Sequence, residues 1–128
     1  MSHRILLVDD DVKILNLLKR YLGQQLGYQV TAVESGEAAV ESALSETFDL
    51  CIIDVHMPGI SGTETYTRLK NLTPGIEGIF FTADTEFEQA LDFLRFSLPA
   101  DRVLTKPLGN FTRLTQLIIG ILGPPTPK

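Results

Sequence analysis

The sequence predicts an α/β domain in which a doubly wound parallel sheet of five strands alternates with five helices. Short apolar runs recur along the chain, and each is followed by a segment with helical periodicity. No internal repeat or shift in composition interrupts this alternation. Strands that alternate with helices are joined by right-handed crossovers, so the sheet should be parallel and covered on both faces.

Composition indicates one globular domain with an acidic surface. The chain has 128 residues, of which 44% are hydrophobic and 21% are charged, as expected for a single core. The formal net charge of -5 disfavours nonspecific binding to nucleic acid or to an anionic membrane. Cys51, the one cysteine, lies in an apolar run and is predicted to be a buried thiol. With no signal peptide and no apolar run of transmembrane length, we expect a cytoplasmic protein.

The first strand is predicted at Arg4–Val8, and the aspartates Asp9, Asp10 and Asp11 follow it directly. Helical spacing then runs from Val12 to Tyr21, with Asp11 as the N-cap. The apolar stripe of this helix comprises Ile14, Leu15, Leu18, Tyr21 and Leu22. The role of N-cap accounts for Asp11 but not for Asp9 or Asp10. Because clustered carboxylates repel each other, Asp9 and Asp10 predict a divalent cation or a lysine nearby.

The second strand is predicted at Tyr28–Val33, after Gly27 ends the helical region. Ser35 or Gly36 should open a second helix that continues to about Glu46. The inner stripe of that helix is predicted to comprise Ala39, Val40, Ala43 and Leu44.

The central strand is predicted at Leu50–Ile53, an unbroken apolar run that suits burial on both faces. Asp54 follows it, and a loop with Pro58 and Gly59 comes next. An ionised carboxylate is costly to bury alone, so Asp54 predicts a cation, hydrogen-bond donors or a catalytic role. The alternative is an ordinary cap for the following turn.

The same alternation continues to the end of the chain. The remaining predicted elements are a helix at Ser61–Leu72 with Tyr66 and Leu69 inward, a strand at Gly78–Phe81 leading into Thr82 and Ala83, a helix at Asp84–Ser97, a strand at Arg102–Thr105 leading into Lys106, and a helix from about Asn110 to Leu122 with Leu114, Leu117, Ile118 and Ile121 as its stripe. We expect the domain to cover residues 1–123 and the proline-rich residues 124–128 to be a tail or the start of a linker.

Polar side chains that follow the predicted strands should meet at one site, because parallel strands place their carboxyl ends at the same edge of a sheet. These residues are Asp9, Asp10, Asp54, Thr82 and Lys106. Carboxylate oxygens are hard ligands that suit Mg²⁺, while a lysine and a hydroxyl can hold an anion beside it. The set is typical of metal-assisted phosphoryl transfer to an aspartate nucleophile.

In order and spacing, these motifs resemble the receiver domain of two-component response regulators over nearly the whole chain. The resemblance rests on Ile-Leu-Leu-Val-Asp-Asp at 5–10, Asp-Val-His-Met-Pro-Gly-Ile-Ser-Gly at 54–62, Thr-Ala at 82–83 and Lys-Pro at 106–107. It implies a flavodoxin-like fold with strand order 2-1-3-4-5. It also implies a phosphoacceptor in a phosphorelay, served by a sensor histidine kinase or a histidine phosphotransfer protein.

The resemblance assigns roles to the acidic residues. Asp54 would accept a phosphoryl group from a phosphohistidine. Asp10 and Asp54 would bind Mg²⁺ directly, together with the backbone carbonyl of His56. Asp9 would act mainly through water.

Thr82 and Lys106 would contact the phosphoryl oxygens, and the bond from Lys106 to Pro107 would be cis. Their structural alternatives are a cap for Thr82 and a solvated strand-end charge for Lys106. In many receivers an aromatic residue three positions before this lysine moves inward when the threonine engages the phosphoryl group. Val103 holds that position here and has no large ring to relocate.

Phosphorylation is expected to switch a surface formed by the fourth helix and the fifth strand. This region carries more apolar residues than one helical stripe needs, namely Phe87, Phe93, Phe96, Ile119 and Leu122. They belong either to the core or to a docking or homodimer face on the fourth and fifth helices.

Three other functions fit parts of the pattern. Phosphatases that work through an aspartyl phosphate resemble a pattern with a second aspartate, the general acid, two residues after the nucleophile. That position is His56 here, so the general acid is missing. A receiver-like interaction module that is not phosphorylated should have lost part of the acidic cluster or the lysine, and none is lost. Flavin binding is disfavoured because aspartates after the first strand repel a phosphate. We therefore expect a signalling domain and no metabolic enzyme, with catalysis limited to its own phosphorylation and dephosphorylation.

Overall fold

The computed structural model describes residues 3–83, 102–106 and 111–124, without the side chains of residues 83 and 106. The predicted helix at 84–97 and its three phenylalanines lie outside these ranges.

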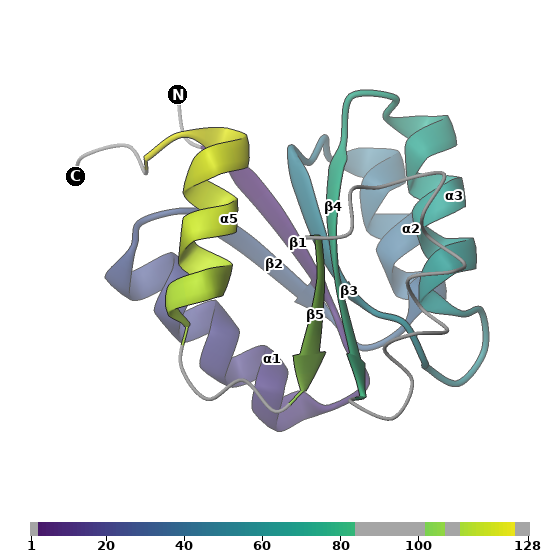
Figure 1. The fold of residues 1–128 in the computed structure, drawn as a ribbon. Helices are drawn as coiled ribbons and strands as arrows, with labels where there is room; N and C mark the ends of the chain where they lie inside the picture. The colour runs from purple at the N-terminus through teal and green to yellow at the C-terminus, as the bar shows by residue number, and fades with distance from the viewer. Residues whose placement is uncertain (1–2, 84–101, 107–110, 125–128) are drawn as a thin grey trace.

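Five parallel strands form one sheet with the order β2-β1-β3-β4-β5, as the sequence predicts (Figure 1). The strands are β1 (Arg4–Val8), β2 (Gln29–Val33), β3 (Leu50–Asp54), β4 (Glu77–Ala83) and β5 (Val103–Lys106). All five residues of the central strand β3 are buried. This agrees with its continuous apolar run, since helices cover both faces of a doubly wound sheet.

Helices flank the sheet on both sides (Figure 1). They are α1 (Val12–Lys19), its continuation η1 (Arg20–Gln25), α2 (Gly36–Ser45), α3 (Gly62–Leu72) and α5 (Thr112–Leu122). Packing divides them into two layers, with α1, η1 and α5 on one face and α2 and α3 on the other. No helix in the described part of the chain has the length and apolarity needed to span a bilayer.

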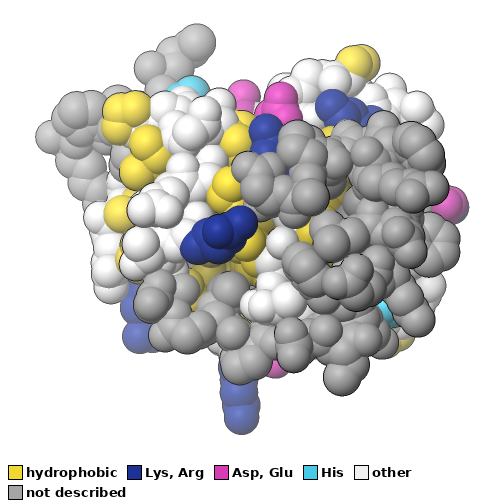
Figure 2. All heavy atoms as spheres, viewed as in Figure 1, with side chains coloured by type: hydrophobic (Ala, Val, Ile, Leu, Met, Phe, Trp, Pro, Cys, Tyr) yellow, Lys and Arg dark blue, Asp and Glu magenta, His cyan; other side chains and the backbone are white. Residues whose placement is uncertain are grey.

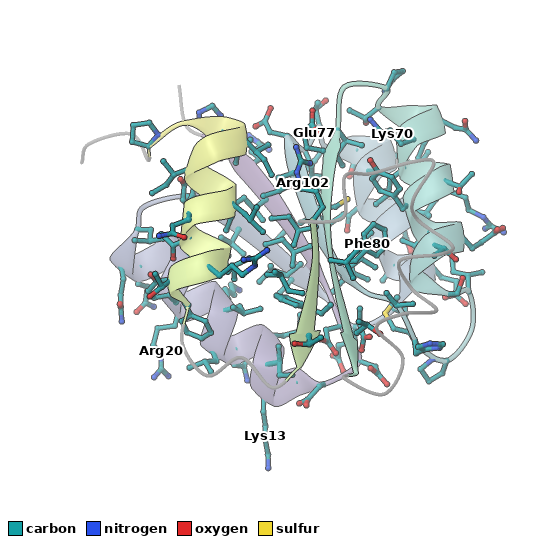
Figure 3. The ribbon with its side chains drawn as sticks, viewed as in Figure 1. Lys13, Arg20, Lys70, Glu77, Phe80 and Arg102 are labelled. Carbon is teal, nitrogen blue, oxygen red and sulfur yellow. The ribbon has the colours of Figure 1, made fainter. Side chains whose placement is uncertain are left out.

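The core consists of two apolar clusters, one on each face of the sheet, because side chains along a strand alternate between faces. The α1 and α5 side contains Ile5, Leu7, Ile52, Leu18, Leu22, Leu114 and Ile118. The α2 and α3 side contains Leu6, Val8, Ile53, Phe80, Ala39, Tyr66 and Leu69. On that side the ring of Phe80, labelled in Figure 3, meets Tyr66 edge-on with centroids 5.3 Å apart. Burial raises the pKa of the Tyr66 hydroxyl to about 12.

Cys51 is fully buried, as predicted. Its thiol donates to the carbonyl of Glu77 at 3.4 Å, and burial raises the pKa of the thiol. Close by, the side chain of Arg102 donates to the carboxylate of Glu77 at 3.1 Å (Figure 3). Arg102 itself precedes β5, which starts one residue later than the apolar pattern predicts.

The first helix differs from its prediction at its carboxyl end. Residues Arg20–Gln25 form a π-helical segment, in which the N–H of Leu26 donates to the carbonyl of Tyr21 at 3.1 Å. Its tyrosine is tied to α5, since the Tyr21 hydroxyl lies 2.7 Å from that of Thr115. Local spacing does not encode such long-range contacts. Gly27, with a φ of 88°, then ends the helical region as predicted.

The prediction that Leu44 lies on the inner face of α2 is wrong. Leu44 is 70% exposed, and Val40 and Ala43 are only partly buried. The buried face of α2 is narrow because it consists of small residues, Gly36 and Ala39, and Leu44 lies beyond its margin.

Helix α5 buries Leu114 and Ile118 as predicted, whereas Leu117, Ile121 and Leu122 pack at the edge of the same core cluster. Ile119 is 39% exposed, and Figure 2 shows hydrophobic side chains at the surface over α5. Of the apolar residues proposed for a docking face, Leu122 therefore serves partly as core and Ile119 faces solvent.

Candidate phosphoacceptor site

Three carboxylates meet at the carboxyl edge of the sheet, where β1 and β3 end side by side. Asp9 continues the alternation of Ile5 and Leu7, and Asp54 continues that of Ile52, so both side chains start on the same face. Together with Asp10 they offer carboxylate oxygens that all lie within 4.8 Å of one another. Asp9 and Asp54 are buried, at 3% and 8% exposure, and Asp10 is exposed. The sequence prediction of an acidic cluster is confirmed.

Of the three consecutive aspartates, Asp9 and Asp11 make different hydrogen bonds. Asp11 caps α1 as predicted, because its carboxylate accepts from the N–H of Lys13 at 3.0 Å and of Ile14 at 3.4 Å. The N–H of Asp11 in turn donates to Oδ1 of Asp9 at 2.9 Å. The helix start thus orients Asp9 toward the cluster.

The loop after β3 is held close to Asp54 by backbone hydrogen bonds. The N–H of His56 donates to Oδ1 of Asp54 at 3.1 Å. On either side, Val55 N–H donates to Phe81 O at 2.8 Å, and Gly62 N–H donates to Val55 O at 2.9 Å. These bonds bring the start of α3 against the end of the central strand. His56 itself is exposed.

Thr82 and Lys106 lie at the same edge, on the next two strands. Asp54 pairs with Phe81, which places Thr82 one residue further along β4, where it is fully buried. Thr82 pairs with Thr105, and Lys106 is the last residue of β5. Both residues are therefore part of their strands, whereas the sequence placed them just after. The predicted cis bond from Lys106 to Pro107 lies outside the described residues.

Val103 is 3% exposed and belongs to the core cluster that contains Phe80 and Tyr66. The position that carries a mobile aromatic ring in many receivers is thus filled by a small side chain packed into the core.

The sequence predicts that Ser35 or Gly36 opens one helix and that Ser61 opens another, but it does not predict that close packing requires the glycines at 36 and 62. Ser61 caps α3 by accepting from the N–H of Glu64 at 3.1 Å, and Gly62 is the first helical residue. A Cβ on Gly62 would collide with the carbonyl oxygen of Asp54 and lie 2.9 Å from Cα of Val55. Glycine is required here by close approach, because φ at Gly62 is not positive. The local signal for this packing is a glycine directly after a serine cap.

Ser35 and Gly36 repeat this arrangement at the start of α2, where Ser35 caps the helix. A Cβ on Gly36 would collide with Oγ1 of Thr65 and lie 2.5 Å from Cγ1 of Ile60. Thr65 is fully buried, and its hydroxyl donates to the carbonyl of Ser61 at 2.7 Å. The starts of α2 and α3 therefore interlock beneath the loop that follows Asp54.

We expect Thr65→Val to lower the free energy of unfolding by about 0.5–1.5 kcal/mol, because the bond from the buried Thr65 hydroxyl to the carbonyl of Ser61 is lost. Urea denaturation measures this change. Thr67→Val is the matched control, since Thr67 makes the same kind of bond to Thr63 at 3.1 Å but is exposed. Its effect should stay within about 0.5 kcal/mol. Equal losses in the two variants would contradict the assigned role of Thr65.

A family model described as the response regulator receiver domain matches residues 5–119. The chain belongs to this family. Its sheet order and acidic edge are those that the sequence resemblance implied. As a receiver domain, it is a phosphoacceptor signalling domain.

Relatives of this receiver domain include longer proteins. The transcriptional regulatory protein RprY of Bacteroides fragilis is 37% identical over 119 residues, which cover 93% of this chain and 49% of that protein. The alkaline phosphatase synthesis transcriptional regulatory protein PhoP of Bacillus subtilis is 35% identical, over 84% of this chain and 43% of that protein. The chain thus spans about half the length of these relatives or less.

Among solved structures, the response regulator TrrA of Thermotoga maritima, in complex with Mg²⁺-BeF, superimposes with a TM-score of 0.78. It is 32% identical, and the match covers 94% of this chain and all of that chain.

Proposed function

We propose that Asp54 is the phosphoacceptor of a two-component phosphorelay and takes its phosphoryl group from a phosphohistidine. The donor would be a sensor histidine kinase or a histidine phosphotransfer protein. The observation that carries this proposal is the meeting of Asp9, Asp10 and Asp54 within 4.8 Å at the strand ends of a receiver fold.

Among the three carboxylates, Asp54 is best placed to act as the nucleophile. It ends the central strand, and the N–H of His56 on Oδ1 orients its carboxyl group. Asp9 receives the N–H of Asp11 at the start of α1. In the transfer, an oxygen of Asp54 forms a bond to phosphorus while the bond from phosphorus to the imidazole nitrogen breaks, and the imidazole leaves with that electron pair.

The donor set fits Mg²⁺, since hard carboxylate oxygens are the ligands this ion prefers. Asp10 and Asp54 would hold the ion together with the backbone carbonyl of His56, and Asp9 would act through water. When bound, Mg²⁺ offsets negative charge on the carboxylates and on the phosphoryl oxygens. Because the clustered carboxylates repel each other, a cation bound between them would relieve this repulsion.

Thr82 and Lys106 are proposed to hold the phosphoryl oxygens, because both end their strands at the same edge as Asp54. A new anion there would draw Thr82 toward it and bias the surface formed by the fourth helix and the fifth strand. With Val103 packed in the core, this switch would work without the relocation of an aromatic ring. The catalysis we propose is limited to the domain's own phosphorylation and dephosphorylation.

The homodimer face on the fourth and fifth helices and the cytoplasmic location stay predictions. So does the division into a receiver unit at 1–123 and a tail or linker at 124–128.

The test is the mass of the intact protein after incubation with acetyl phosphate or phosphoramidate. With Mg²⁺, the chain should gain one phosphoryl group. With EDTA in place of Mg²⁺, the rate of this gain should fall by roughly 100-fold, because the charge on the transferred group is no longer offset. Circular dichroism with and without EDTA checks that the fold is intact. No adduct with either donor would favour the alternative, a receiver-like interaction module that is not phosphorylated.

A further inference from the structure

The segment formed by α1 and η1 is basic, although the chain as a whole is acidic. Residues Val12–Gln25 include Lys13, Lys19 and Arg20 but no aspartate or glutamate, against a net charge of -5 for the chain. All three cations are exposed. Figure 3 shows Arg20 and Lys13 extending from this segment into solvent. An acidic partner would be attracted to this surface and repelled by much of the remainder.

An open groove of about 430 Å³ lies beside this basic segment. It is lined by Asn16, Lys19, Arg20, Gly23, Gln24 and Val30. Pockets for small molecules are usually enclosed and mostly apolar. An open groove with charged and amide side chains is better suited to a stretch of polypeptide that lies along it.

The groove runs beside β2, which is an edge strand of the sheet. The N–H of Gln29 donates to the carbonyl of His3 at 3.0 Å, and the carbonyl of Val33 accepts from Asp9 at 3.2 Å. In a parallel ladder, alternate residues of a strand bond to the same neighbour. Residues 29, 31 and 33 therefore bond toward β1, and the N–H and C=O groups of Val30 and Ala32 point to the outer edge. A strand added from another chain would pair with such groups.

Gly23 leaves the floor of the groove open. A Cβ at this position would lie 3.8 Å from Tyr28 O and from Cγ2 of Val30, which is ordinary contact. Its φ is not positive, so neither packing nor backbone conformation demands glycine. Gly23 is part of the π-helical segment η1, a rare conformation that often accompanies functional sites. The effect of this glycine is to keep space between η1 and β2.

We propose that this groove binds an extended acidic segment of a partner protein. The segment would pair with the outward backbone groups of Val30 and Ala32, while its carboxylates contact Lys19 and Arg20. The proposal is independent of the phosphoacceptor site, because none of the residues proposed to bind Mg²⁺ or phosphoryl lines the groove.

The test is a titration of the ¹⁵N-labelled chain, without phosphodonor, with an end-blocked hexapeptide that alternates acidic residues and valine. At up to about 1 mM peptide, amide shifts should be concentrated at β2 and η1, and added salt should weaken binding. A neutral peptide with glutamine and asparagine in place of the acids should bind more weakly. No shifts, or shifts centred on another surface, would overturn the proposal.

Variants of the groove residues distinguish the contribution of charge to binding from that of the shape of the groove. Lys19→Gln and Arg20→Gln should each weaken binding by about 2–5-fold, as expected for exposed ion pairs. Arg113→Gln, on the exposed side of α5, makes the same charge change outside the groove and should have no effect. Gly23→Leu fills the groove without a change in charge and should abolish binding, with the amide spectrum showing that the fold is retained. An equal loss in Arg113→Gln, or binding of a single-stranded oligonucleotide as tight as that of the peptide, would identify a general polyanion surface and refute the proposal.

Discussion

Asp54→Asn is expected to abolish phosphoryl incorporation from acetyl phosphate and phosphoramidate. The amide keeps the shape of the side chain and an oxygen that can accept from the N–H of His56, which lies 3.1 Å from Oδ1 in the native chain. It lacks the negative charge and nucleophilicity that the transfer requires. Intact-protein mass in the presence of Mg²⁺ measures the result. Thermal stability should be no lower than in the native chain, because one of three clustered charges is removed.

Asp11→Asn is the matched control for this variant. It removes one negative charge a few residues from the cluster, and asparagine caps a helix as well as aspartate does. Phosphorylation should therefore persist in Asp11→Asn. If Asp54→Asn still gained a phosphoryl group at the native rate, the acceptor would be another residue, and the assignment of Asp54 would be wrong.

Gly62→Ala should impair both stability and phosphorylation. The added Cβ meets two groups of the backbone, the carbonyl oxygen of Asp54 and Cα of Val55, and backbone cannot move aside as a flexible side chain can. We expect the free energy of unfolding to fall by about 1–3 kcal/mol, as for other overpacked sites. Because the displaced atoms belong to Asp54, the proposed phosphoacceptor, the rate of phosphorylation should fall as well. Urea denaturation and intact-protein mass measure the two effects.

Gly120→Ala provides the comparison. Gly120 lies in α5, and a Cβ there meets nothing within 4 Å. Alanine favours a helix over glycine by up to about 1 kcal/mol, so this variant should be more stable than the native chain and equally well phosphorylated. A Gly62→Ala variant with native stability and native phosphorylation would show that α3 can shift without moving Asp54.

The acidic edge and its neighbours follow from local patterns. The apolar runs of Ile5–Val8 and Leu50–Ile53 predict strands buried on both faces, and both strands are observed. In a parallel sheet whose first and third strands are neighbours, the strand ends bring Asp9, Asp10 and Asp54 together. Thr82 and Lys106 lie on adjacent strands, as the strand order implied by the resemblance predicts.

Other features depend on contacts between residues far apart in the sequence, which periodicity does not report. The π-helical turn at Arg20–Gln25 accompanies the contact of Tyr21 with Thr115 on α5. Gly62 is essential because of where Asp54 lies in the fold, and Leu44 is exposed because the buried face of α2 is narrow.

The sequence by itself therefore determined the fold class, the strand order through its family resemblance, and the acidic cluster that marks a receiver domain. A buried strand, a cap and a strand-end carboxylate each leave a signature within a few neighbouring residues. Only the tertiary structure decided how α2 and α3 interlock beneath Asp54 and where a groove opens beside β2. Those features arise from close packing of separate elements, and the space between two elements is set by both of them together.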